Sequence, residues 1–178
     1  MSPRILIDCD GVLADFVGHL FRRIGSKKSV ADVTEWNFFE TLEPELHEDA
    51  RDEMNDPKFW ESQPVLPGAI EGCQMIKAKG HEIVCVTSPS NMFGWSNVRE
   101  TWVRNHFKNL ITATICTEHK YMVRGMCLLD DKIQNIRKWE EHNQPFGRAV
   151  LFEQPWNSLD EHDCRASGWA EILRRGFV

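Results

Sequence analysis

Two pairs of aspartates give this 178-residue chain its strongest chemical signal. Asp8 and Asp10 follow an apolar run, and Asp130 and Asp131 follow another. Residues two apart on a strand project to the same side, so Asp8 and Asp10 can converge on one point. Like charges crowded into one small volume raise a carboxyl pKa unless a cation lies between them. The pairs therefore indicate a hard cation such as Mg²⁺, a shared proton, or both.

Hydroxyl and ammonium groups follow two further apolar runs. Thr87 and Ser88 stand at the end of the run 82–87, where hydroxyls and free backbone N–H groups can hold phosphate oxygens. Lys120 comes shortly after the run 111–116, and its point charge can hold a nucleophile and a phosphoryl group together. Taken singly, these are a common turn and a common solvated lysine. Four strand ends that carry acid, hydroxyl, base and acid in turn favour phosphoryl transfer chemistry.

The elements that must position these groups alternate along the chain. Apolar runs typical of strands cover 4–10, 82–87, 111–116, 126–129 and 148–152, and amphipathic stretches typical of helices cover 68–79, 95–107, 132–142 and 166–175. This alternation predicts an α/β fold with a Rossmann-like parallel sheet that has helices on both faces. Ligands bind at the carboxyl ends of such strands, where the four groups would meet. The alternative for Asp131 is a cap on the helix expected near Lys132.

Residues 16–66 break this alternation, because they lack an apolar strand and are rich in acids and aromatics. We expect them to form a small helical cap inserted after the first strand, with residues 1–15 and 67–178 forming the α/β core. The aromatic residues of the cap either stack on a base, which is worth about 1–3 kcal/mol per base, or form a small core of the cap itself. These residues are Trp36, Phe38, Phe39, Phe59 and Trp60.

Composition limits the partners of the chain. The net charge of −6 and the absence of a dense Lys/Arg run argue against a nucleic acid polymer, although a small anion remains compatible with a local cation. Six cysteines without a CxxC pair predict reduced, mostly buried thiols. No stretch has the length and apolarity of a membrane span, so we expect a cytoplasmic location. The sequence does not decide between a monomer and a homodimer.

Two other enzyme classes are disfavoured by missing motifs. The chain has no GxxxxGK[ST] phosphate loop, which argues against a P-loop kinase. Its seven histidines and six cysteines show no ligand spacing typical of zinc.

The order of the segments DCDGV, VTSPS, HK and LLDD resembles the four motifs of the haloacid dehalogenase superfamily of phosphatases. Within it, the chain is similar to the 5'(3')-deoxyribonucleotidase family. The closer similarity rests on DCDGVLADF, LPGA, TSPSNMF followed by RETWV, LLDD, and VLF followed by Pro-Trp-Asn. It covers nearly the whole chain and is weakest in residues 16–66.

This resemblance implies a haloacid dehalogenase-like core and a role for each motif residue. Asp8 matches the nucleophile that forms an aspartyl-phosphate, and Asp10 matches the acid/base. Thr87 and Lys120 match the catalytic residues that hold the phosphate. The implied Mg²⁺ ligands are Asp8, the backbone carbonyl of Asp10, and Asp130, with Asp131 alongside.

The resemblance also implies a substrate and the residues around it. The expected activity is Mg²⁺-dependent hydrolysis of deoxyribonucleoside 5'-monophosphates, with a nucleoside monophosphate as the small-molecule partner. The nucleoside pocket would be lined by Phe16, Trp36 and Trp60, and Arg99 matches a basic residue near the substrate. Glu118 departs from the family, which has a basic residue two positions before the lysine. The alternatives are a phosphatase for another small phosphoester, such as a sugar phosphate, and a non-catalytic nucleotide-binding module.

Overall fold

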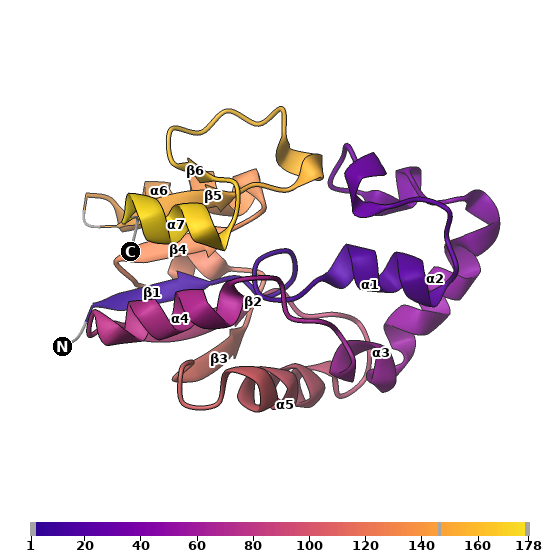
Figure 1. Cartoon of the computed structure of the whole chain (residues 1–178), viewed down its shortest axis with the longest axis horizontal. Coiled ribbons are helices and arrows are strands. Elements are labelled where there is room, and N and C mark those ends of the chain that lie inside the picture. The colour runs from indigo at the N-terminus through magenta and orange to yellow at the C-terminus, as the bar shows by residue number, and fades with distance from the viewer. Residues whose placement is uncertain (1–2, 146, 177–178) are drawn as a thin grey trace.

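The computed structural model describes residues 3–145 and 147–176. Its centre is a parallel sheet of six strands in the order β3-β2-β1-β4-β5-β6 (Figure 1). The strands are β1 (Arg4–Ile7), β2 (Glu82–Thr87), β3 (Ala113–Cys116), β4 (Cys127–Asp130), β5 (Arg148–Phe152) and β6 (Arg165–Ala166). The helices outside residues 16–66 are α4 (Ala69–Ala78), α5 (Trp95–Phe107), α6 (Ile133–Asn143) and α7 (Trp169–Arg175). The predicted α/β fold with a parallel sheet is therefore confirmed.

The C-terminal end of the chain differs from the prediction. The helix expected at 166–175 begins only at Trp169, because Ala166 belongs to β6 and pairs with Phe152. A strand of two residues is too short to produce a periodic pattern. The first strand also ends earlier than expected, at Ile7, so Asp8 and Asp10 lie in the turn that follows it.

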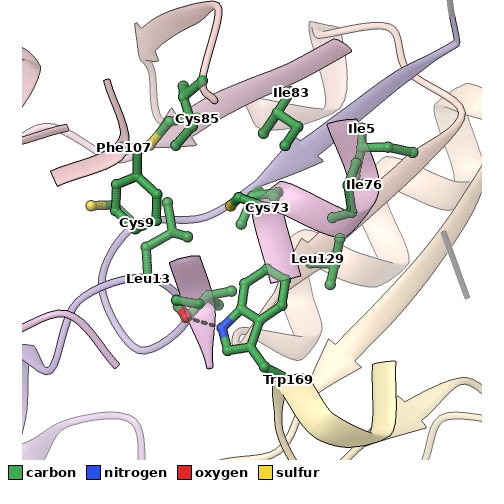
Figure 2. Close-up of a cluster of buried hydrophobic side chains, with 14 of the residues drawn as sticks. Ile5, Cys9, Leu13, Cys73, Ile76, Ile83, Cys85, Phe107, Leu129 and Trp169 are labelled. Carbon is green, nitrogen blue, oxygen red and sulfur yellow. Dashed lines mark hydrogen bonds between the residues drawn. The ribbon is translucent and has the colours of Figure 1, made fainter. Parts of the chain in front are cut away.

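One face of the sheet packs against α4, α5 and α7. Figure 2 shows how Ile5, Cys73 and Trp169 meet in this layer, which is the largest buried cluster. The indole Nε1 of Trp169 donates a hydrogen bond of 2.8 Å to the carbonyl of Val12. Helix α7 is thereby fixed to the turn that carries the first aspartate pair.

The other face of the sheet packs against α6. Leu6 and Leu128 point to this side, where they meet Ile136 and Trp139. Their strand neighbours Ile5 and Leu129 point to the opposite cluster. Burial of alternate residues on both faces explains why these strands read as continuous apolar runs.

Residues 16–61 form a helical segment beyond the carboxyl ends of the strands (Figure 1). Its helices are α1 (Phe16–Arg23), α2 (His47–Asn55) and α3 (Pro57–Glu61), with short 3-10 helices η1 (Val30–Asp32), η2 (Phe38–Glu40) and η3 (Pro44–Leu46) between α1 and α2. Phe21, Phe59 and Trp60 form part of a separate hydrophobic cluster, which also includes Trp95 of α5.

The two connections of this segment lie side by side. Asp15 donates its backbone N–H to the Pro64 carbonyl at 2.9 Å, and Leu66 donates to Leu13 at 2.8 Å. The Asp15 carboxylate also accepts a hydrogen bond from the backbone of Gly18 and so caps α1. The segment therefore leaves and re-enters the core at one place, next to Asp8 and Asp10.

The cysteines form no disulfide among the described residues. All six cysteines are free, and four of them are buried, as predicted. Among the described residues, no helix has both the length and the apolar character needed to span a bilayer.

Candidate active site

A cavity of about 320 Å³ lies at the carboxyl edge of the sheet, between the core and the helical segment. This volume is within the range of small-molecule sites. Ten of the residues singled out from the sequence line it, namely Asp8, Asp10, Phe16, Trp36, Phe38, Trp60, Thr87, Ser88, Lys120 and Asp131. Asp130 is fully buried beside this group, and Arg99 is buried behind Asp10.

Lys120 joins the first and the last of the predicted strand ends. Its Nζ lies 2.7 Å from Oδ1 of Asp8 and 2.8 Å from Oδ2 of Asp130, and only 2% of its side chain is exposed. The backbone N–H of Cys9 donates to the same Asp8 oxygen at 2.7 Å. Both contacts of Asp8 therefore use Oδ1, which fixes the direction of its carboxylate.

The buried carboxylates around Lys120 carry more negative charge than this one lysine can neutralise. Burial raises the pKa of Asp8 to about 7; Lys120 opposes this rise, while Asp130 adds to it. Burial also opposes the charge on Lys120, but Asp130 and Asp8 outweigh it and raise the pKa of the ammonium group. A single buried lysine thus faces several carboxylates, an imbalance that a divalent cation would correct.

Asp8, Asp130 and Asp131 have carboxylate oxygens that lie within 4.8 Å of one another. Asp131 accepts a hydrogen bond from Trp156 Nε1 on Oδ2 at 3.1 Å, whereas its buried Oδ1 has no hydrogen-bond partner. Burial, followed by the charges of Asp8 and Asp130, raises the pKa of Asp131 well above its ordinary value. A buried oxygen without a donor beside two other carboxylates fits the oxygen ligands of Mg²⁺.

The alternative role of Asp131 as a helix cap is wrong. Helix α6 begins at Ile133, its N-cap residue is Lys132, and no side chain caps it there. The backbone N–H of Lys132 donates instead to Asp130 Oδ1 at 2.9 Å. Asn135 adds hydrogen bonds of 3.1 Å to both oxygens of Asp130. Asp130 is therefore held by α6 on one side and by Lys120 on the other.

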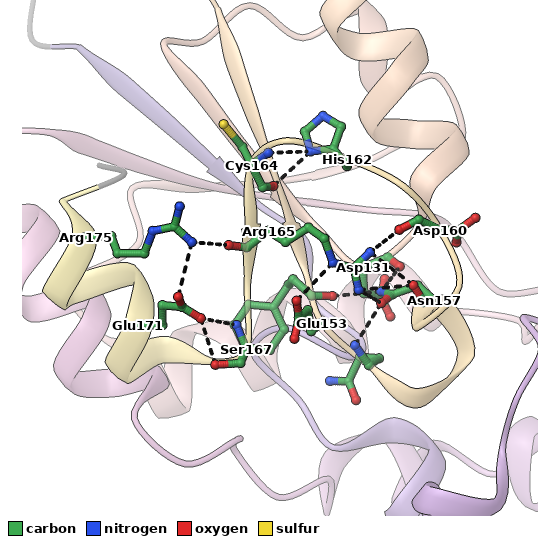
Figure 3. Close-up of polar contacts among 12 residues, drawn as sticks. Asp131, Glu153, Asn157, Asp160, His162, Cys164, Arg165, Ser167, Glu171 and Arg175 are labelled. Atoms are coloured by element: carbon green, nitrogen blue, oxygen red, sulfur yellow. Dashed lines mark hydrogen bonds and ion pairs between the residues drawn. The ribbon is translucent and has the colours of Figure 1, made fainter.

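The loop after β5 supports the turn at Asp131, and sequence reasoning did not assign it a role. Asn157 donates to the carbonyls of Asp131 and Phe152 at 2.7 and 2.9 Å (Figure 3). Gln154 donates to the carbonyl of Gly11 at 2.6 Å. The Pro-Trp-Asn sequence marked this loop as similar to the family, but nothing in the spacing indicates which carbonyls it reaches.

Gly11 brings the two aspartate turns into close contact. Its φ is +79°, and a Cβ at this position would lie only 2.2 Å from Asp131 Oδ2. A side chain would be strained by the backbone and would also displace Asp131. The glycine after the first aspartate pair is thus required for both reasons.

Aromatic side chains form the wall opposite the carboxylates. Phe16 stacks on Trp60 with ring centroids 5.5 Å apart and an interplanar angle of 25°. Trp60 is buried and belongs to the core of the helical segment, and it also lines the cavity. Trp36 is 49% exposed, and its ring packs edge to face with that of Trp156. The Nζ of Lys132 lies 4.4 Å from the centroid of the Trp36 ring.

Two residues named in the sequence analysis, Arg99 and Glu118, do not line the cavity. Arg99 is not in the cavity wall; its guanidinium binds both oxygens of Asp10 from behind, at 2.8 and 2.9 Å. Glu118 is exposed and lies in a neighbouring groove that contains Arg51. The departure at Glu118 is therefore outside the carboxylate cavity.

Comparisons with known proteins identify the family of the chain. A family model described as "5' nucleotidase, deoxy (Pyrimidine), cytosolic type C protein" matches residues 2–175. The mitochondrial 5'(3')-deoxyribonucleotidase of Mus musculus is 29% identical over 183 residues, which cover 94% of this chain and 82% of the mouse protein.

Solved structures show the same fold at low sequence identity. A haloacid dehalogenase-like hydrolase from Streptococcus pneumoniae has a TM-score of 0.62 at 12% identity, with 98% of each chain covered. The D,D-heptose 1,7-bisphosphate phosphatase from B. bronchiseptica, complexed with magnesium and phosphate, has a TM-score of 0.59 at 12% identity and covers 99% of this chain and 98% of its own. With a haloacid dehalogenase-like fold and a family match along almost its whole length, the chain belongs to the 5' nucleotidase, deoxy (pyrimidine), cytosolic type C family, and so to the phosphoric monoester hydrolases.

Proposed function

We propose that this protein is a Mg²⁺-dependent phosphatase that hydrolyses deoxyribonucleoside 5'-monophosphates through an aspartyl-phosphate on Asp8. One observation carries the proposal: Asp8, held by Lys120, shares a single cavity with the stacked rings of Phe16 and Trp60. The cavity thus combines a nucleophile for phosphorus with an apolar wall for a base. The name of the family and of the mouse relative point to the same substrate class.

In the first step, Asp8 attacks the phosphorus of the substrate. Lys120 and Cys9 hold Oδ1, so we assign the attack to Oδ2. The new Asp8 Oδ2–P bond forms as the bond from phosphorus to the 5'-oxygen breaks. Asp10, in its protonated form, gives its proton to the departing 5'-oxygen, which leaves as the nucleoside hydroxyl.

In the second step, water replaces Asp8 on phosphorus. The Asp10 carboxylate accepts a proton from the water, a new O–P bond forms, and the Asp8 Oδ2–P bond breaks. Inorganic phosphate leaves, Asp8 returns as a carboxylate, and Asp10 is again protonated. Asp10 lines the cavity with 28% of its side chain exposed, which suits both proton transfers. Thr87 and Ser88, at the end of β2, are proposed to hold the phosphate oxygens.

The proposed Mg²⁺ ligands are Asp8, Asp130, Asp131 and the backbone carbonyl of Asp10. The unpartnered Oδ1 of Asp131 and the close oxygens of Asp8 and Asp130 support this assignment. When bound, the ion would neutralise negative charge on the phosphate oxygens. Lys120 already neutralises part of the charge on Asp8 and Asp130 and so keeps the two carboxylates close together.

The helical segment 16–66 is proposed as a cap that binds the nucleoside. Its Phe16, Trp36 and Trp60 supply aromatic surface that a base can stack on, and such stacking is worth about 1–3 kcal/mol in proteins that bind single strands. A sugar phosphate would need more hydrogen-bonding groups than this wall offers. The aromatic wall therefore favours a nucleotide over the alternative of a sugar phosphatase.

Phosphate release tests the proposal directly. The panel consists of deoxy- and ribonucleoside monophosphates and sugar phosphates, each with Mg²⁺ or with EDTA, and Asp8→Asn is the matched inactive variant. We expect Mg²⁺-dependent release that favours deoxyribonucleotides and is absent from Asp8→Asn. Release from sugar phosphates alone would reject the substrate class, and no release from any ester would favour the non-catalytic module.

A further inference from the structure

Arg99 of α5 is a fully buried charge beside the proposed acid/base. None of its side chain is exposed, and it is one of the largest fully buried side chains in the described residues. Burial of a charge is unfavourable unless the charge is paired and hydrogen-bonded. Such a residue therefore requires a specific partner, and the contacts of its guanidinium identify that partner.

The guanidinium makes hydrogen bonds to three residues in two segments of the chain. Its Nη2 donates to Oδ1 and Oδ2 of Asp10 at 2.8 and 2.9 Å. Its Nη1 donates to Oε1 of Gln63 at 2.8 Å and to Sγ of Cys9 at 3.1 Å. The turn after β1 and the connection that returns from the helical segment are thus joined through one side chain.

Tryptophan rings enclose the guanidinium on the remaining sides. Its carbon lies 5.0 Å from the ring centroid of Trp60, 5.3 Å from that of Trp95 and 5.6 Å from that of Trp102. Trp102 also donates its indole N–H to the backbone carbonyl of Gln63 at 2.9 Å. Cation–π contacts of this kind hold an arginine in place without competing for its hydrogen bonds. The position of both terminal nitrogens is therefore fixed by packing.

Asp10 lies between Arg99 and the cavity. Its side chain lines the cavity, whereas Arg99 does not. Because a single nitrogen serves both oxygens, each oxygen of Asp10 retains a second lone pair, on which it can exchange a proton with the cavity. The arrangement orients the Asp10 carboxylate and leaves the lone pairs on its cavity side free for proton exchange.

We propose that Arg99 is a positioning residue, which holds the Asp10 carboxylate against the cavity wall for proton transfer and does not itself bind the substrate phosphate. The inference rests on the proposed function, in which Asp10 protonates the leaving group. Gln63 and Trp60 join this assembly from the helical segment and its returning connection, so the orientation of Asp10 depends on how that segment is seated.

The choice of leaving group separates this role from others. Thymidine 5'-monophosphate needs a proton on its departing oxygen, whereas 4-nitrophenyl phosphate releases a stable phenolate without one. For Arg99→Gln we expect kcat on thymidine 5'-monophosphate to fall about 10²-fold, the lower end of what general acid–base catalysis contributes. KM should stay within about twofold, because such a loss appears in kcat when the interaction acts only in the transition state. Single-turnover release of 4-nitrophenolate should fall much less.

Three further variants control for structural effects. Arg99→Lys keeps a charged donor near Asp10 and should recover part of the lost kcat. Arg104→Gln makes the same change at an exposed position of α5 and should behave as the native protein. Gln63→Ala removes a partner of Arg99 without touching Asp10; it should show a smaller loss with the same dependence on leaving group. This last variant tests the proposal even where Arg99→Gln does not fold, as judged by circular dichroism.

A double-variant cycle completes the test. If Arg99 acts through Asp10, then Arg99→Lys should have no further effect on turnover in an Asp10→Asn background. Equal losses on both substrates, or equal effects in both backgrounds, would show a structural role only. A raised KM with unchanged kcat would show that Arg99 binds substrate. Any of these three results overturns the inference while the native protein remains active. A native protein that releases phosphate from neither ester overturns the proposed function as well.

Discussion

At the scale of single residues, the site is organised by one cation for each group of carboxylates. Lys120 serves Asp8 and Asp130, and Arg99 serves Asp10. Both cations are buried, so salt screens their attraction to these carboxylates only weakly. Asp131 has no cation of its own, and this is why we place the metal ion next to it.

The close approach of Gly11 to Asp131 gives a prediction at this scale. In Gly11→Ala, the new Cβ would lie 2.2 Å from Asp131 Oδ2 and so displace the carboxylate. We expect the Mg²⁺ concentration for half-maximal stabilisation to rise at least about tenfold, the lower end of the effect of losing groups that orient metal ligands. A fluorescence melting series with increasing Mg²⁺ measures it.

Gly25→Ala is the matched control, because Gly25 also has a positive φ, of +68°, but an added Cβ meets nothing within 4 Å. Both variants carry backbone strain on the order of 1 kcal/mol. Only Gly11→Ala should change the response to Mg²⁺. Equal responses in the two variants would mean that Asp131 is not part of the metal site.

At the scale of elements, short loops after the strands hold the site, while helices fix those loops from behind. Trp169 of α7 holds the turn at Val12, α5 carries Arg99, and the loop after β5 holds the turn at Asp131 through Asn157. None of these supporting residues places a charged group in the cavity.

The strand-end residues were predictable because parallel strands bring their carboxyl ends to one edge.

The supporting contacts were not predictable in the same way. The pairing of Arg99 with Asp10 joins residues 89 positions apart, and that of Asn157 with Asp131 joins residues 26 apart. Such contacts depend on helix packing and loop paths, which leave no periodic pattern in the sequence. Resemblance to a family therefore indicated a basic residue near the substrate at Arg99, whereas its pairing with Asp10 is seen only in the structure.

The start of α7 gives a pH-dependent prediction. Glu171 accepts hydrogen bonds from the backbone N–H and hydroxyl of Ser167, at 2.9 and 2.8 Å (Figure 3). The backbone bond first, and then the hydroxyl and Arg175, lower its pKa to about 2. A lowered folded-state pKa stabilises the protein above the ordinary value of 4.5, and this stabilisation is lost as the pH falls from there toward 2.

Glu171→Gln should therefore lower the melting temperature at pH 7. The difference from the native protein should shrink through pH 4 and vanish near pH 2, because Glu171 is then protonated in both the folded and the unfolded state. Melting curves from pH 7 to pH 3 measure this trend. A constant difference across that range would mean that the charge of Glu171 does not contribute.

At the scale of the whole molecule, the sheet supplies the charged half of the site and the helical segment supplies the aromatic half. The fold, the parallel sheet and the sides of the cavity were predictable from strand and helix periodicity together with the order of the motifs. The exact path of residues 16–61 was not, because the six short helices there follow no single period. Phe16 was named through the resemblance to the family, and Trp60 by its residue type as well, whereas their stacking on each other depends on tertiary packing.

The excess of carboxylates predicts how metal affects the stability of the whole protein. Mg²⁺ that binds only the folded state should stabilise it by about 2.7 kcal/mol at a hundred times the dissociation constant. Asp131→Asn should be more stable than the native protein in EDTA, because a neutral amide replaces a buried carboxyl group that lies beside two other carboxylates. It should gain less from Mg²⁺. Urea denaturation with Mg²⁺ or EDTA measures both effects, and an unchanged gain from Mg²⁺ would remove Asp131 from the ligand set.

The central claim is that Asp8 becomes phosphorylated, and trapping this intermediate tests it most directly. Asp10→Asn should slow the attack of water, so the intermediate should accumulate when this variant is mixed with 4-nitrophenyl phosphate and Mg²⁺ and quenched in acid. Peptide mass spectrometry should then find one phosphoryl group on Asp8 and none in the Asp8→Asn, Asp10→Asn double variant. Release of 4-nitrophenolate without a phosphoryl group on Asp8, or with the group on another residue, would contradict the account.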